Sequence, residues 1–66
     1  MYVVVNGKQM ELAEATTLAE LIQIMGLSDA KIAVEINTEI VRRSDHRKHI
    51  LNTADRIEIV HAVGGG

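Results

Sequence analysis

The chain has 66 residues, of which 47% are hydrophobic, so it builds one small domain and a two-domain enzyme is excluded. It has no cysteine, which excludes a disulfide framework, a thiolate metal cluster and a thiol nucleophile, and with one Tyr and no Phe or Trp its core must be aliphatic. The formal net charge of −2, with no run of cations among aromatic residues, argues against a nucleic-acid partner.

The first predicted element is a β-hairpin. Residues 2–5 are aromatic or β-branched, and Asn6-Gly7 separates them from an alternating segment over residues 8–12. Asn-Gly between two such runs is a strong hairpin signal, because a type I′ turn needs positive φ at both central residues. Strand alternation then turns Val3 and Val5 toward the core and their neighbours away from it.

The same N-terminal segment bears on localisation. Its apolar run, residues 1–5, is too short to span a membrane, and it lacks the basic flank and the length of a signal peptide. We therefore expect a cytoplasmic protein with no membrane partner.

A helix is predicted to begin at Thr17. Residues 17–20 fit a capping box, in which the Thr17 hydroxyl accepts from a backbone N–H and Glu20 reaches back to the cap. Gly26 occurs where a left-handed helix end is favoured. Between these signals, residues spaced i, i+3, i+4 and i+7 form one apolar stripe that we expect to pack on a sheet: Leu18, Leu21, Ile22 and Met25.

Three more strands are predicted after the helix. Residues 32–36 alternate between apolar and other side chains and end at a turn, after which Ile40-Val41 begins a short return strand. The last strand is predicted over residues 56–63, with Ile57 and Ile59 on the face that points to the core.

Charge dominates the segment from residue 42 to residue 52. Its cations are interpreted as a solvated loop face, with steering of an acidic partner as the alternative: Arg42, Arg43, Arg47 and Lys48. His46 and His49 are interpreted as solvated loop histidines and not as metal ligands, because a closed structural site needs four ligands. Ile50 and Leu51 form an apolar pair that we expect at one edge of the core.

The order of these elements predicts a single α+β domain over residues 1–66, with one helix packed across a mixed sheet of four to five strands. No spacing marks a nucleophile elbow or a catalytic carboxylate pair, and a chain this short has little room for an enclosed pocket of about 300 Å³. We therefore expect no enzyme, no metal site and no bound cofactor. Any chemistry is expected to be done to this chain by a larger protein.

The most informative feature is the tail Val63-Gly64-Gly65-Gly66, which holds three of the five glycines. Glycine lacks a Cβ, so a flexible tail over residues 63–66 can enter a narrow channel and bring the α-carboxylate of Gly66 to a buried site. That carboxylate is ionised at neutral pH and can attack the α-phosphorus of ATP to give a mixed anhydride, an activated acyl donor. A frayed terminus without function is the alternative.

Four segments of the chain carry a resemblance to a known family: residues 3–7, 17–21, 33–37 and 55–66. Together they resemble the thiamine-pathway sulfur carrier proteins, which are relatives of the molybdopterin-synthase small subunit and of ubiquitin. The resemblance implies the β-grasp fold of ubiquitin, with the first and last strands central and parallel. The terminal glycine pair, here Gly65-Gly66, is the functional signature of that family.

The resemblance also implies a function. In that family an E1-like adenylyltransferase consumes ATP to adenylate the terminal carboxylate, which then becomes a thiocarboxylate and serves thiazole synthase as its sulfur donor. Gly66 is accordingly the modified residue, Gly65 is its slim neighbour, and Val63 and Gly64 extend the docking tail. On this basis the chain is a co-substrate, a monomer when free, and its terminus is the place where it holds sulfur.

Three positions depart from the family pattern. Members of the family often have Pro where Arg42 stands, Trp near His46, and Gly where Ala54 precedes Asp55. The first two departures lie in the variable loop. If that turn needs a positive φ, Ala54 strains the backbone there, because alanine adopts this conformation less readily than glycine.

A partner-docking patch is predicted on the outward face of the sheet, at Val4, Val60 and Ala62. Three other functions remain open for a domain of this kind. They are a carrier like the molybdopterin-synthase small subunit, a ubiquitin-like protein modifier whose tail is joined to lysines, and a non-covalent β-grasp binding module with an inert tail.

Overall fold

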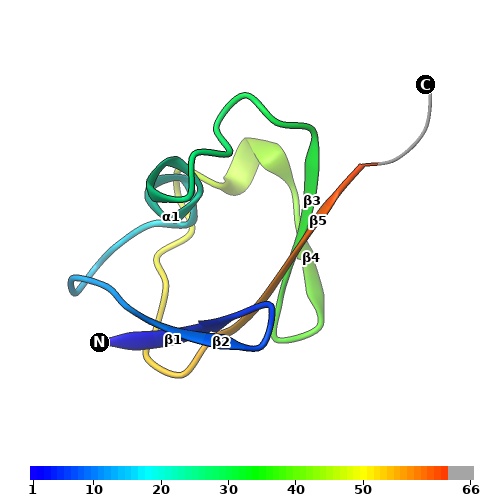
Figure 1. Ribbon diagram of the computed structural model, residues 1–66. Helices are drawn as coiled ribbons and strands as arrows, with labels where there is room; N and C mark the ends of the chain where they lie inside the picture. Colours follow the sequence, from blue (N-terminus) through cyan, green and yellow to red (C-terminus); the bar gives the residue numbers. More distant parts are fainter. Residues whose placement is uncertain (63–66) are drawn as a thin grey trace.

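In the computed structural model, which describes residues 1–62, a five-stranded mixed sheet carries one helix across one face (Figure 1). The strands are β1 (Tyr2–Val5), β2 (Lys8–Glu11), β3 (Ile32–Ile36), β4 (Glu39–Val41) and β5 (Arg56–His61), and the helix is α1 (Leu18–Ile24). In the order β2-β1-β5-β3-β4, β1 and β5 are parallel neighbours and the other pairs are antiparallel. The predicted α+β fold, with its first and last strands central and parallel, is confirmed.

The β1–β2 hairpin forms at the predicted turn. Asn6 and Gly7 have φ values of 49° and 83°, the left-handed conformation that both central residues of a type I′ turn need. Val3 and Val5 are buried, whereas Tyr2 is exposed. The alternation predicted for this strand is therefore confirmed.

Helix α1 begins at the predicted capping box. Oγ1 of Thr17 accepts from the N–H of Glu20 at 3.2 Å, and the N–H of Thr17 donates to Oε1 of Glu20 at 2.8 Å. After seven helical residues, Gly26 has a φ of 74°, the left-handed conformation that commonly ends a helix. Within residues 1–62, no helix combines the length and the hydrophobicity needed to cross a bilayer.

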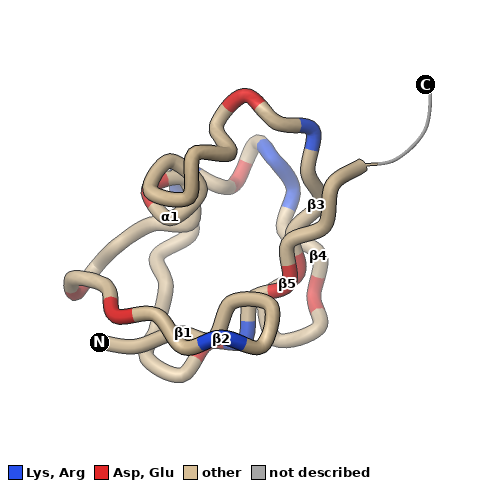
Figure 2. Tube along the Cα trace, viewed as in Figure 1, with Lys and Arg blue, Asp and Glu red and all other residues tan. Residues whose placement is uncertain are grey.

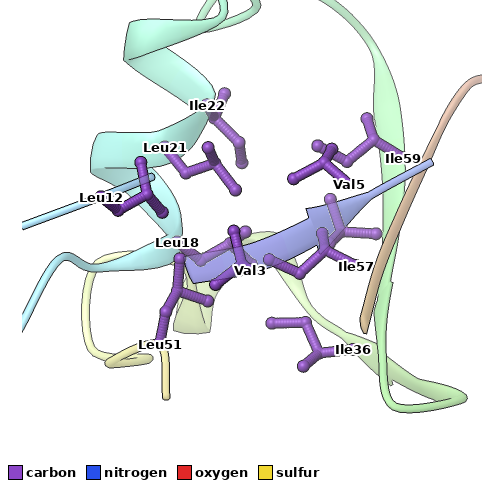
Figure 3. Close-up of a cluster of buried hydrophobic side chains, with 11 residues drawn as sticks. Val3, Val5, Leu12, Leu18, Leu21, Ile22, Ile36, Leu51, Ile57 and Ile59 are labelled. Carbon is purple, nitrogen blue, oxygen red and sulfur yellow. The ribbon is translucent and has the colours of Figure 1, made fainter. Parts of the chain in front are cut away.

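The core is aliphatic, as the composition requires. In Figure 3, Leu18, Leu21 and Ile22 of α1 face side chains of β1 and β5. Each fully buried side chain of this size stabilises the fold by about 1.5–3 kcal/mol. Within the described chain the cluster consists of Val3, Val5, Leu12, Leu18, Leu21, Ile22, Val34, Ile36, Leu51, Ile57 and Ile59, with Met25 and Ile32 partly buried against it.

His46 differs from its prediction as a solvated loop histidine. It is only 8% exposed, and its Nε2 lies 3.2 Å from the carbonyl oxygen of Val41. A 3₁₀ turn over Arg43–Asp45 ends at His46 and folds its ring back toward β4, where that carbonyl is its hydrogen-bonding partner. The prediction of a solvated side chain was therefore wrong for His46. His49 is half-buried, so part of its side chain is in contact with solvent.

The two residues of the predicted apolar pair, Ile50 and Leu51, differ in burial. Leu51 is buried in the core, but Ile50 is 56% exposed. Ile50 forms an isolated antiparallel bridge with Thr17, and extended backbone turns successive side chains to opposite sides. Only one member of such a pair can face the core, so the prediction is confirmed for Leu51 and wrong for Ile50.

The four cations of the same segment are exposed, as predicted: Arg42, Arg43, Arg47 and Lys48. Figure 2 shows basic positions on the stretch of chain that follows β4. Strand β5 is shorter than predicted and ends at His61, because its partner β3 begins at Ile32, opposite His61.

Candidate functional site

The candidate site is the end of the strand that leads into the glycine tail. β5 has β1 on one side and β3 on the other, and Ile57 and Ile59 fix it in the core. In Figure 1, β5 crosses the view diagonally and its end points away from the N-terminus. Two neighbouring strands and buried side chains therefore hold the first part of β5 in place, ahead of the residues that lead to the tail.

A network of side chains holds the start of β5. Asp55 is buried, and its carboxylate accepts from Nδ2 of Asn37 at 3.0 Å and from the N–H of Asn52 at 2.8 Å. Oδ1 of Asn37 accepts from the N–H of Arg56 at 2.9 Å. Ala54 has a φ of 69°, so the turn before β5 does need the left-handed conformation for which the family's glycine is suited.

The end of β5 is held differently on its two sides. On the β3 side, the ladder continues past the strand, and the N–H of Ala62 donates to the carbonyl oxygen of Lys31 at 2.8 Å. On the β1 side, the carboxamide of Asn6 bonds the backbone of Ile59, with Nδ2 donating to O at 3.1 Å and Oδ1 accepting from N–H at 2.8 Å. The sequence identifies Asn6 only as a turn residue, because no local pattern signals this contact.

Two of the predicted docking residues share one face of β5. Val60 is 57% exposed and points away from the core, and Ala62 is exposed two residues further along the same side of the chain. Ala33, which the sequence analysis did not single out, is exposed directly opposite Val60 on β3. These residues form a small outward apolar group next to the tail, here called the exit patch: Ala33, Val60 and Ala62.

Val4 is not part of the exit patch. It is half-buried, and the parallel register sets it level with Arg56, four residues before Val60. The structure therefore separates Val4 from the other two predicted docking residues. Ile40, 77% exposed on β4 opposite Glu35, is a further outward apolar residue that the prediction missed.

Val63, Gly64, Gly65 and Gly66, the predicted tail, lie outside the described residues. Within residues 1–62, no group of three or more His, Cys, Asp or Glu side chains is placed to hold a metal ion. The larger hollows of the described surface are open to solvent, as on the β4 face between Ile40 and His49.

Comparison with known proteins places the chain in a defined group. A family model described as the ThiS family matches residues 3–66, which include the glycine tail. A sulfur carrier protein ThiS from Escherichia coli is 30% identical over 66 residues, a match that covers 100% of both chains. The crystal structure of a thiamine biosynthesis protein (ThiS) from Geobacter metallireducens covers 100% of both chains with a TM-score of 0.86 and 29% identity.

Longer proteins contain a similar segment. A thiazole synthase from Paramagnetospirillum magneticum is 36% identical over all 66 residues, but the chain spans only 20% of its length. The chain likewise spans 20% of a thiazole synthase from Magnetococcus marinus, at 36% identity.

Proposed function

The chain belongs to the ThiS family, and from this premise we propose that it is a sulfur carrier protein of thiamine biosynthesis, with Gly66 as the residue that carries the sulfur. The observation that carries the proposal is the family match over residues 3–66, because it joins the β-grasp domain to the glycine tail. The whole-length similarity to the E. coli sulfur carrier supports the same function.

The proposed chemistry takes place on the α-carboxylate of Gly66. A carboxylate oxygen attacks the α-phosphorus of ATP in an E1-like adenylyltransferase, pyrophosphate leaves, and an acyl adenylate forms. Sulfide then attacks the carbonyl carbon and AMP leaves, which gives the thiocarboxylate directly. A persulfide donor instead forms an acyl disulfide as AMP leaves, and a thiol that attacks the donor's sulfur of this S–S bond releases the thiocarboxylate and is itself left in a disulfide with the donor. The chain is a co-substrate in this sequence: the adenylyltransferase consumes the ATP, and the carrier binds no cofactor of its own.

The tail and the exit patch contact different parts of the partner enzyme. Val63, Gly64 and Gly65 pass through a narrow channel of the partner, since residues without large side chains fit where others do not. The exit patch contacts the rim of that channel, because it lies beside the point where the tail leaves the sheet. Val4, set apart at the level of Arg56, is a separate contact.

Two partners are proposed. The E1-like adenylyltransferase activates the tail, and thiazole synthase receives the sulfur. The similarity between the chain and one fifth of the length of two thiazole synthases supports the second partner, since a segment similar to this chain occurs there within the polypeptide of that enzyme. Cytoplasmic localisation and a monomeric free state stay predictions, which cell fractionation and light scattering can test.

Intact-mass measurement tests the proposed function. The carrier is incubated with the adenylyltransferase, ATP and a sulfide donor, and we expect the mass gain of one oxygen replaced by sulfur. A variant that lacks Gly66 serves as the control: its terminal carboxylate stops about 3.5 Å short of the reacting phosphorus, so no gain is expected. No mass gain in the unmodified chain with an adenylyltransferase that thiolates the E. coli protein contradicts the proposal.

A further inference from the structure

Asn6 joins the first turn of the chain to its last strand. Its backbone, with a φ of 49°, forms the β1–β2 turn. Its carboxamide at the same time makes two hydrogen bonds to Ile59, at 3.1 Å from Nδ2 and at 2.8 Å to Oδ1. The two residues are 53 positions apart in the sequence, so this contact is a tertiary one.

The carboxamide of Asn6 makes the hydrogen bonds to β5 that a longer β1 would make with its backbone. In a parallel ladder, every second residue donates its N–H to the neighbouring strand, and the N–H of Asn6 donates to the carbonyl oxygen of Ile57 at 2.8 Å. The next donor in this series is Lys8, but Lys8 already belongs to β2. A carboxamide has the donor and the acceptor of a peptide group, so Asn6 supplies the next pair of bonds at Ile59 itself.

Beyond Ile59, the described end of β5 has a strand on one side only. The β3 side continues as far as the bond between Ala62 and Lys31, while on the other side the chain has turned into β2. A strand end bound along one edge can swing about that edge. Such a swing changes the direction in which the chain leaves the sheet, four residues before Gly66.

We propose that Asn6 is a positioning residue for the activation of Gly66: its carboxamide fixes the direction in which β5 presents the tail to the activating enzyme. This inference rests on the proposed function. A strand end whose direction is already fixed loses less conformational freedom on binding. The contribution of Asn6 therefore falls on the KM of the adenylyltransferase for the carrier, because the enzyme itself aligns the tail once it is bound.

Asn37 provides a matched control at the other end of β5. It also begins a two-residue turn, with a φ of 51°, and its Oδ1 accepts from the N–H of Arg56. Asn6→Gly and Asn37→Gly each keep the left-handed turn, because glycine adopts it freely, and each removes a side-chain contact to β5. Only Asn6 lies beside the departure of the tail.

Amide hydrogen exchange of the free carrier tests the geometry without any enzyme. We expect Asn6→Gly to speed the exchange of the Ile59 and Ala62 amides by about tenfold, because local opening of the strand end becomes easier. Asn37→Gly is expected to speed the exchange of Arg56 and to leave that of Ala62 unchanged. Equal exchange rates at Ala62 in the two variants overturn the inference.

Activation kinetics test the consequence, at a temperature where both variants are folded. We expect Asn6→Gly to raise the KM about tenfold with kcat changed less than about twofold, and Asn37→Gly to keep both values. An unchanged KM in Asn6→Gly, or an equal rise in both variants, overturns the inference. Failure of the unmodified chain to be activated contradicts the proposed function instead, and amide exchange then decides the role of Asn6.

Asn6→Asp separates the carboxamide from the turn. Aspartate keeps the size of the side chain, the preference for this turn position and the acceptor for the Ile59 N–H. It replaces the Nδ2 donor with an oxygen that faces the carbonyl oxygen of Ile59, so we expect the KM to rise at least as far as in Asn6→Gly. A KM equal to that of the unmodified chain shows that the turn alone matters and overturns the inference.

Discussion

The hairpins β1–β2 and β3–β4 flank β5 from opposite sides, and their turns have the same length and the same first residue. Each has a two-residue turn that begins with an asparagine of positive φ, Asn6 in the first and Asn37 in the second. Each asparagine also bonds the backbone of β5, at Ile59 near its end and at Arg56 at its start. The central strand is thus held at both ends by turn side chains.

The two hairpins differ in the residue at the second position of the turn. It is Gly7 in the first, with a φ of 83°, and Thr38 in the second, with a φ of 74°. A residue with a β-branched side chain is strained in this conformation, whereas glycine is not. The β3–β4 side has in addition the buried carboxylate of Asp55, which bonds Asn37. The β1–β2 turn is therefore unstrained, and one side chain, that of Asn6, joins it to β5. The β3–β4 turn is strained at Thr38, and a network of Asn37 and Asp55 joins it to β5.

The largest expected effect is the loss of that network in Asp55→Ala. Nδ2 of Asn37 and the N–H of Asn52 then lose their acceptor in a site where Asp55 is only 6% exposed. We expect the free energy of unfolding, measured by urea denaturation, to fall by about 2–3 kcal/mol. Asp29→Ala removes a carboxylate from an exposed position and is the control. A loss in Asp55→Ala no larger than that of the control contradicts the role assigned to the network.

The first hairpin, the helix and the faces of the strands could be predicted from the sequence because their signals are local. Asn6-Gly7 favours a type I′ turn, Thr17 and Glu20 cap the helix within four residues, and alternation over a few positions assigns Val3 and Ile57 to the core. The prediction for the glycine tail also depends on a local signal, because it rests on residue type and on the resemblance of residues 55–66 to the sulfur carriers and not on a tertiary contact.

The contacts that hold β5 could not be predicted, because they depend on the register of distant strands. Asn6 meets Ile59 across 53 positions, and Asn37 meets Arg56 across 19. The left-handed conformation of Thr38 has no local signature, since threonine is uncommon there. The position of Val4 relative to the other predicted docking residues could not be predicted for the same reason. Alternation indicates that Val4 faces outward, but only the pairing with Arg56 shows how far along the sheet it lies from Val60.

The next largest effect is expected when the relaxed turn is given the residue of the strained one, in Gly7→Thr. A Cβ built at Gly7 meets nothing within 4 Å, so the cost comes from the backbone conformation and not from a clash. We expect thermal and urea denaturation to show a loss of about 1–2 kcal/mol. Gly7→Asn is the control, because asparagine tolerates positive φ, and it should lose clearly less. Equal losses in both variants contradict the argument from φ.

The reverse change, Thr38→Gly, is expected to have the smallest effect and the opposite sign. Thr38 is exposed and its φ of 74° lies closer than that of Gly7 to the left-handed minimum near 57°, so less strain is released than Gly7→Thr creates. The more flexible unfolded chain offsets part of the gain, which leaves a stabilisation of about 0.5–1 kcal/mol in urea denaturation. Thr53→Gly has no positive φ to relieve and should lose stability instead. If Thr38→Gly also loses stability, the two turns do not differ in strain, and the contrast between the two sides of β5 reduces to the Asp55 network.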